Sequence, residues 1–143
     1  MLEFLMGETV VPACNRSLLD AYKFEQPSDL MKAPLLHLVS RPDAWENWFQ
    51  TQDAPTGPLH GMLFDQFATA SQAAISGLGV ALLPEFLTKG EFSRGDLVRA
   101  LDLPTRSVQN YYLAWPSHRS SYAPLQAFRD WVIKESREAG ERD

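Results

Sequence analysis

The sequence predicts an α/β fold built on a mainly parallel sheet, and three observations support this prediction. Short apolar runs alternate along the chain with segments of helix length. The run Val80–Leu83 is almost continuously apolar and ends at Pro84, which is typical of a strand buried on both faces. The helix-length segments carry recognisable start and stop residues. Strands that alternate with helices favour βαβ units, in which the strands run parallel.

The predicted strands are short apolar segments rich in β-branched or aromatic residues. Several are bounded by proline, which cannot donate a hydrogen bond to a sheet. In chain order the predicted strands are Thr9–Val11, Leu35–Val39, Met62–Phe64, Val80–Leu83, Leu97–Val98 and Tyr111–Trp115.

The first clear helix signal follows the second predicted strand. Ser40 and Asp43 form a capping-box pattern, with a serine as the N-cap and an acid three residues later. The apolar residues that follow have helical spacing, which predicts one buried face. They are Trp45, Trp48 and Phe49.

Two more helices are predicted further along the chain. Thr69 and Gln72 repeat the capping logic, and Gly77 is the expected end of that helix. The last helix is expected to begin near Pro124. Its tail from Glu135 is wholly polar, so we expect this end to fray.

Composition indicates a soluble globular chain with an acidic surface. Of 143 residues, 45% are hydrophobic and 22% are charged. The formal net charge is −5, which makes the chain itself a poor nucleic-acid binder. The sequence contains no apolar run long enough to span a membrane, and Met1–Glu8 does not resemble a secretory signal. These features favour the cytoplasm.

Metal, cofactor and disulfide chemistry have no support in the sequence. Cys14 is the single cysteine, and a lone cysteine cannot form an internal disulfide. His37, His60 and His118 are isolated, without the spacing of a zinc site. The glycines match neither a dinucleotide-binding fingerprint nor a Walker motif. We therefore expect no cofactor and no metal.

Taken together, several segments resemble the effector domain of LysR-type transcriptional regulators. The segment Leu38–Trp45, followed by Trp48 and Phe49, resembles the glycine-cleavage-activator subgroup of that family. Each segment is weak alone, but all occur in register over roughly residues 8–135. The other matching segments are Val11–Asn15 with Leu18–Leu19, Phe64–Asp65, Gln72–Ala74, Gly77–Pro84, Leu97–Val98, Tyr111–Pro116 and Ala127–Trp131.

The resemblance implies a type II periplasmic-binding-protein-like fold, with two α/β subdomains joined by crossover strands. The chain would be an incomplete version of it. Residues 1–13 would end the first subdomain and form the first crossover strand, and residues 14–110 would form the second effector-binding subdomain. Residues 111–143 would supply the second crossover strand and a C-terminal helix that returns to the first subdomain.

The same resemblance implies an effector-sensing regulatory domain and not an enzyme. A small-molecule co-inducer, such as an amino acid or another carboxylate, would bind in the cleft between subdomains. DNA would be bound only through an N-terminal winged helix-turn-helix that this sequence lacks. The absent half predicts exposed apolar surface and self-association as a homodimer or higher homo-oligomer.

Candidate effector contacts lie where predicted strands lead into helices, because a helix N-terminus leaves backbone N–H groups unpaired near its positive end. Ser40 and Arg41 form the first such site, and the Arg41 guanidinium suits a carboxylate. Phe64, Asp65 and Gln66 form the second. The alternatives are that Arg41 is a surface residue and that Asp65 only caps the helix.

Three further candidates have strong alternative roles. Asn15 lies where the first crossover enters a helix, and a role as N-cap is the better interpretation. Trp45 is the aromatic residue nearest its helix start, although core packing is the default. Tyr112 lies on the second crossover, where Tyr111 and Tyr112 must face opposite sides.

Two other functions compete with the regulatory domain. A small α/β enzyme would use Cys14 as a nucleophile or an Asp/His pair, but no catalytic motif supports either. The sequence near Cys14 supplies no base, and a small buried residue is the better interpretation. A stand-alone solute-binding protein of the same fold would need a signal peptide and both subdomains.

Overall fold

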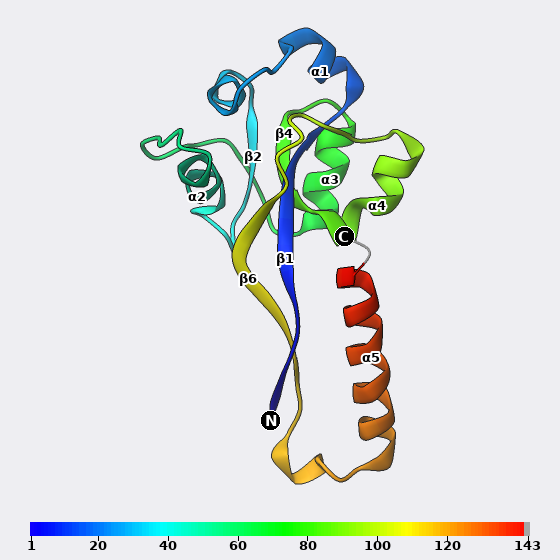
Figure 1. The fold of residues 1–143 in the computed structure, drawn as a ribbon. Helices are drawn as coiled ribbons and strands as arrows, with labels where there is room; N and C mark the ends of the chain where they lie inside the picture. The colour runs from blue at the N-terminus through cyan, green and yellow to red at the C-terminus, as the bar shows by residue number, and fades with distance from the viewer. Residues whose placement is uncertain (142–143) are drawn as a thin grey trace. The chain divides into compact units, whose positions relative to one another are not determined.

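A computed structural model describes residues 1–141, which fall into two compact units (Figure 1). The larger unit is Thr9–Thr105. The smaller unit combines Met1–Glu8 with the chain from Arg106 onward. The long strand β1 (Leu2–Cys14) passes from one unit to the other.

The larger unit contains a mixed sheet, with strand order β3-β2-β4-β1-β5. The mainly parallel sheet that we predicted is therefore wrong in part. β2 pairs parallel with β3 and with β4, but β1 pairs antiparallel with β4 and β5. The antiparallel register matches Val10 with Pro84 and Ala13 with Ala81. The bounds are β2 (Leu35–Leu38), β3 (Met62–Phe64), β4 (Val80–Pro84) and β5 (Val98–Arg99).

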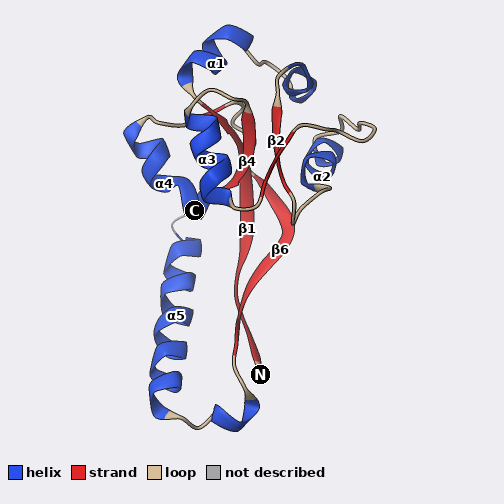
Figure 2. Cartoon of the chain, turned by 180° about the vertical axis from the view of Figure 1, so that it is seen from behind, coloured by secondary structure: helices blue, strands red, loops and turns tan. Residues whose placement is uncertain are grey.

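Helices cover both faces of this sheet, which is why β2 and β4 read as almost wholly apolar (Figure 2). One buried cluster joins the sheet to α1, the 3₁₀ helix η1 and α2, and a second joins it to α3 and α4. The α/β class is confirmed. The bounds are α1 (Arg16–Tyr22), η1 (Pro27–Lys32), α2 (Ala44–Thr51), α3 (Phe67–Ile75) and α4 (Glu85–Arg94).

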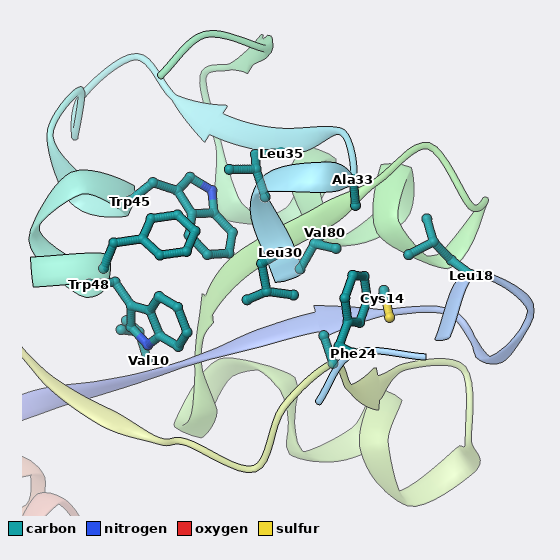
Figure 3. Close-up of a cluster of buried hydrophobic side chains, with 12 residues drawn as sticks. Val10, Cys14, Leu18, Phe24, Leu30, Ala33, Leu35, Trp45, Trp48 and Val80 are labelled. Atoms are coloured by element: carbon teal, nitrogen blue, oxygen red, sulfur yellow. The ribbon is translucent and has the colours of Figure 1, made fainter. Parts of the chain in front are cut away.

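Three aromatic side chains of α2 belong to the first cluster and lie at one end of it (Figure 3). Trp45, Trp48 and Phe49 are at most 2% exposed. The Trp45 ring lies 5.7 Å from the Trp48 ring and 5.6 Å from the Phe49 ring. The helical spacing of these residues therefore places them on one buried face, as the sequence predicted.

The predicted capping box at Ser40 is wrong. α2 begins at Ala44, and its N-cap is Asp43, which makes no side-chain capping bond within the described chain. The chain first makes a turn, in which the Arg41 N–H donates to the Leu38 carbonyl at 3.1 Å. This turn uses the residues that the capping pattern had assigned to the helix start.

The start of the next helix was also predicted too late, although its end is confirmed. α3 begins at Phe67 with Gln66 as N-cap, so Thr69 lies inside the helix. Gly77 ends the helical segment, because its φ of 84° is readily adopted only by glycine. Its N–H donates to the Ala74 carbonyl at 3.0 Å.

The smaller unit contains the first part of β1, all of β6 (Thr105–Ala114) after its first residue, the 3₁₀ helix η2 (Ser117–Arg119) and α5 (Ala123–Glu141). α5 continues to Glu141, so its polar tail is helical where we expected fraying; residues 142 and 143 lie outside the described chain. The predicted exposed apolar surface is present here. Its members include Leu2, Phe4, Val108, Tyr112, Phe128 and Trp131.

A fully buried carboxylate is the main polar feature of the smaller unit. Glu8 on β1 is 0% exposed. One of its oxygens accepts a hydrogen bond from Ser107 at 2.9 Å, and the other accepts one from Tyr111 at 2.5 Å. Two hydroxyl donors from β6 thus offset part of the cost of burying this charge.

Candidate functional site

The carboxyl ends of β2 and β3 bring two of the predicted segments together. Leu38 and Phe64 are register partners at the last residues of these parallel strands. The Val39 N–H, just after β2, donates to the Phe64 carbonyl at 2.9 Å. The residues that follow each strand must therefore lie at one edge of the sheet. They are Ser40, Arg41, Asp65 and Gln66, all predicted from the sequence.

Arg41 has a defined position at this edge. Its guanidinium carbon lies 4.7 Å from the centre of the Phe67 ring, at the first residue of α3. Stacking on an aromatic ring holds a guanidinium plane while leaving its edge able to donate hydrogen bonds. Phe67 was not among the predicted site residues, because its role depends on the pairing of β2 with β3.

The N-terminus of α3 adds a second positive feature at this edge. Gln66 makes no side-chain capping bond within the described chain, and the first turn of α3 contains no acidic residue. The first N–H groups of a helix have no partner inside the helix and lie at the positive end of its dipole. The Arg41 side chain lies beside this helix start, so the two features favour an anionic group together.

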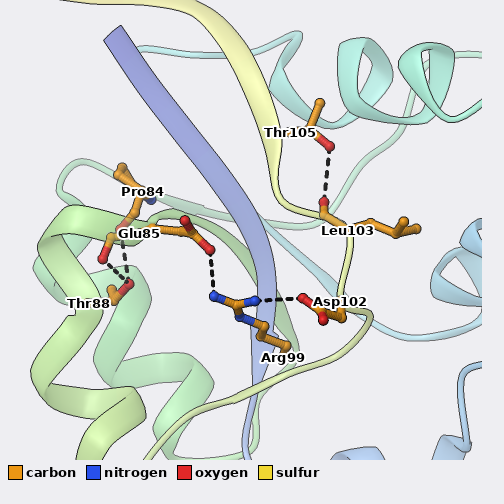
Figure 4. A network of polar contacts seen from close by, with 7 residues as sticks. All are labelled: Pro84, Glu85, Thr88, Arg99, Asp102, Leu103 and Thr105. Atoms are coloured by element: carbon orange, nitrogen blue, oxygen red, sulfur yellow. Dashed lines mark hydrogen bonds and ion pairs between the residues drawn. The ribbon is translucent and has the colours of Figure 1, made fainter. Parts of the chain in front are cut away.

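The N-terminus of α4 lies at the same edge but is less suited to an anion. Glu85 is its first residue, and its carboxylate accepts a hydrogen bond from Arg99 at 2.7 Å (Figure 4). The other branch of Arg99 donates to Asp102 at 2.6 Å. This network ties the start of α4 to the loop that precedes β6, and it places a negative charge at the helix start.

One acidic and two neutral polar side chains complete the edge. Ser40, Asp65 and Gln66 are exposed to solvent. A hydroxyl and an amide can donate or accept hydrogen bonds, whereas the Asp65 carboxylate, when ionised, only accepts them. The edge therefore combines a guanidinium and helix N–H groups with a carboxylate.

Three other predicted contacts have structural roles in the larger unit. The Trp45 indole N–H donates to the Leu36 carbonyl at 2.9 Å inside the core. Phe64 is half-buried and packs against the cluster beneath α3. Asn15 caps α1 by accepting the Leu18 N–H at 2.9 Å, and it also donates to the Ile75 carbonyl at 3.3 Å.

Asn15 is not part of the group at the carboxyl edge of β2, and Tyr112 belongs to the other compact unit. Asn15 follows Cys14, at the end of β1 that pairs with the start of β4, so it lies at the opposite edge of the sheet. Tyr112 belongs to the smaller unit, where it is 50% exposed and packs edge-on against Phe4 at 5.8 Å.

Cys14 lacks the properties of a nucleophile. Its side chain is fully buried and free of any disulfide. Burial raises the pKa of the Cys14 thiol to about 11, which keeps it protonated at neutral pH. Within residues 1–141 there is also no cluster of histidine, cysteine or acidic side chains that could hold a metal. In the same residues, no helix is both long and apolar enough to cross a bilayer.

A buried histidine and a half-buried glutamate were not predicted from the sequence. His37 on β2 is 6% exposed, and its Nε2 atom has no hydrogen-bond partner in the described chain. Glu46 on α2 accepts the Leu59 N–H at 2.9 Å, which anchors the loop between α2 and β3. Their only sequence signal was polar character inside otherwise apolar segments.

We expect the free energy of unfolding to fall on mild acidification because of His37. Burial lowers the pKa of His37 below its ordinary value of 6.5, and the nearby Glu46 carboxylate offsets this only in part. The unfolded state therefore binds more protons in the range below pH 6.5, so stability is lost as the pH falls through that range.

Urea unfolding at several pH values between neutral and mildly acidic checks this expectation. The pH dependence should be smaller in His37→Gln, whereas His118→Gln, at an exposed position, should behave as the parent. An unchanged pH dependence in His37→Gln would contradict the assignment.

Comparison with known proteins identifies the family. Residues 2–137 match the family described as LysR substrate binding domain. The chain belongs to this family. The resemblance that we inferred from dispersed segments is thus confirmed, and so is the expectation of a regulatory domain that is not an enzyme.

The relatives of this LysR domain are transcriptional regulators. It is 35% identical to the transcriptional activator AmpR of Rhodobacter capsulatus, over 90% of this chain and 43% of that protein. It is 33% identical to the glycine cleavage system transcriptional activator of Escherichia coli, over 92% of this chain and 44% of that protein. The chain therefore spans less than half the length of these relatives.

A solved structure shows the same fold. The effector domain of AmpR from Pseudomonas aeruginosa superposes with a TM-score of 0.86 at 24% identity. The match covers 99% of this chain and 68% of that one. At this identity the comparison establishes the fold, which is the periplasmic-binding-protein-like fold of LysR effector domains.

Proposed function

We propose that this LysR domain binds a small amino acid at the carboxyl edge of β2 and β3. The observation that carries the proposal is the position of Arg41 against Phe67, beside the uncapped start of α3. Arg41 and the first N–H groups of α3 would bind the effector carboxylate. Asp65, on the turn that precedes α3, would accept hydrogen bonds from its ammonium group.

Binding would act by changing the relative stability of two arrangements of the parent regulator. A ligand shifts such an equilibrium only if it binds one arrangement more tightly than the other. The parent would carry the signal to DNA through a winged helix-turn-helix and would act in the cytoplasm. The acidic chain described here has a net charge of −5 and would not itself contact DNA.

We expect Arg41→Ala to weaken effector binding by about 10-fold or more, because it removes a charge-assisted hydrogen-bond donor. The measurement is a thermal-shift screen of this chain with glycine, alanine, glutamate and benzoate, followed by calorimetry on any compound that stabilises it. Arg16→Ala is the matched control, since Arg16 is an exposed residue of α1 at the opposite edge of the sheet.

Three outcomes distinguish an amino-acid site from a general carboxylate site and from the absence of binding. An amino acid that stabilises the parent chain and loses affinity in both Arg41→Ala and Asp65→Asn supports the proposal. Equal binding of benzoate and amino acids, with no effect of Asp65→Asn, would restrict the site to carboxylates. No stabilisation by any of the four compounds would contradict the proposal for this chain.

We further propose that the exposed apolar surface of the smaller unit mediates homo-oligomer formation. Phe128 and Trp131 on α5 are 49% and 57% exposed, and their rings lie 6.0 Å apart. Solvent-exposed aromatic pairs of this kind are typical of protein interfaces. Replacing both by serine should lower the mass measured by light scattering, whereas Leu87→Ser, at an exposed position on α4, should not. A monomeric parent chain would contradict this proposal.

A further inference from the structure

The larger unit contains a hollow that the proposed effector site does not use. It has a volume of about 350 Å³ and opens to solvent. Its walls come from the end of η1, the start of β2, the loop before β3 and Leu78. Small-molecule sites in proteins commonly occupy roughly 300–1,000 Å³ and are lined mostly by apolar side chains. The hollow therefore has the size of a site for a small ligand.

This hollow lies at the other edge of the sheet from Arg41. Leu35 and Met62 line it, and they are the first residues of β2 and β3. The effector edge follows Leu38 and Phe64, the last residues of the same strands. A compound in the hollow would therefore leave the carboxyl edge open, and the two sites could be occupied together.

Two glycines bring the chain close to β2 and to the residue before it, and one of them, Gly61, lines the hollow. A Cβ atom on Gly61 would lie 2.1 Å from the Leu35 carbonyl oxygen, and one on Gly79 would lie 2.5 Å from that of Pro34. A residue larger than glycine would fit at neither position unless the backbone shifted. The loops on both sides of β2 are therefore held against the strand by backbone packing.

Apolar side chains surround the opening of the hollow. Met31, Met62 and Leu78 line it, and they are 38%, 50% and 47% exposed. When an apolar ligand covers leucine and methionine side chains in a concave opening, their removal from water favours binding. Methionine is also flexible enough to pack against ligands of different shape.

The polar groups of the hollow select for a neutral ligand. Among its lining residues, His60 is the one with a polar side chain, and none carries a fixed positive or negative charge. Directly behind Gly61 lies the buried His37, whose Nε2 atom has no partner in the described chain. Burying a carboxylate here would cost free energy, because nothing in the lining offsets its charge.

We propose that this hollow is a second small-molecule site, which takes a neutral aromatic or branched aliphatic compound with one hydrogen-bonding group. The apolar part packs against Met31, Met62 and Leu78, and the polar group meets the His60 side chain. The site is independent of the proposed effector edge, because it shares no residue with it.

The test uses indole as a neutral probe and indole-3-acetate as its charged counterpart. Each is titrated into the isotopically labelled chain while backbone amide shifts are recorded. We expect saturable shifts at Gly61 and Leu78 with indole, and binding of indole-3-acetate that is weaker by about 10-fold or more. Amides of Ser40, Arg41 and Asp65 should not shift with indole, which separates this site from the effector edge.

Variants at the opening provide the second part of the test. The double variant Met62→Ala with Leu78→Ala should weaken indole binding by about 5-fold or more, because it removes apolar contact area. Leu87→Ala is the matched control, since Leu87 is 48% exposed on α4. The substituted residues are half-exposed, so the variants should stay folded, and a thermal melt checks this.

Four results would each overturn the proposal. The first is the absence of saturable shifts with indole, and the second is shifts confined to the carboxyl edge. The third is indole-3-acetate binding as tightly as indole, which would contradict selection for a neutral ligand. Equal loss of indole binding in the double variant and in Leu87→Ala would also contradict the assigned position.

Discussion

Replacing Trp45 by alanine should lower the free energy of unfolding by about 3–5 kcal/mol, the range for large-to-small changes of buried aromatic residues. Trp45 is 1% exposed, and its ring contacts those of both Trp48 and Phe49. The substitution would leave a cavity in the cluster of α2. It would also leave the Leu36 carbonyl without the indole N–H that it accepts at 2.9 Å.

Chemical denaturation of Trp45→Ala and Trp45→Phe measures the two parts of this effect. Phenylalanine keeps much of the packing but loses the indole hydrogen bond, so its cost should be smaller, about 1–3 kcal/mol. A loss below about 1 kcal/mol in Trp45→Ala would show that the core is not arranged as described.

The same pair of variants tests whether Trp45 contacts the effector. We expect Trp45→Phe to leave the affinity for a carboxylate effector unchanged, because the indole ring points into the core. A fall in affinity as large as that of Arg41→Ala would instead support a direct contact, as the sequence analysis had suggested.

Replacing Gly61 by alanine should cost about 2 kcal/mol or more of stability, because overpacking against a rigid neighbour forces the backbone to shift. The added Cβ would meet the Leu35 carbonyl oxygen at 2.1 Å and the His37 ring at 3.0 Å. Both neighbours belong to β2, which is buried along its length. The parallel pairing of β2 with β3 should therefore be weakened.

Gly57 provides a control from the same loop. A Cβ added at Gly57 meets nothing within 4 Å. Gly57→Ala should therefore be neutral or stabilise slightly, because it reduces the freedom of the unfolded chain. Urea unfolding of the two variants measures the difference. Equal stability would mean that the loop before β3 does not pack closely on β2.

Local chemistry explains which parts of the fold were predictable. Apolar runs located β2, β3 and β4 to within a residue. For β2 and β4 the reason is that a strand buried on both faces must be apolar along its length. The spacing in α2 predicted its buried aromatic face, and Gly77 predicted the end of α3, because only glycine takes its φ readily.

The helix starts and the strand directions were not predictable by the same means. A capping pattern at Ser40 is satisfied equally well by a turn that precedes the helix, and the structure contains the turn. The direction of β1 is a property of its partners, because an apolar strand can pair in either direction. Neither the long β1 nor the buried Glu8 had a local signal that distinguished it from an exposed segment.

The same distinction between local and tertiary information applies to the candidate site. The sequence by itself determined the α/β class, the family and the residue types that suit an anion, because periodicity, glycine positions and side-chain chemistry are local properties. Only the tertiary structure decided which predicted residues share an edge. The parallel register of Leu38 with Phe64 brings Arg41 to Phe67, whereas Trp45 is drawn into the core and Asn15 lies at the opposite edge. Register and packing depend on residues far apart in the chain, and local patterns do not carry that information.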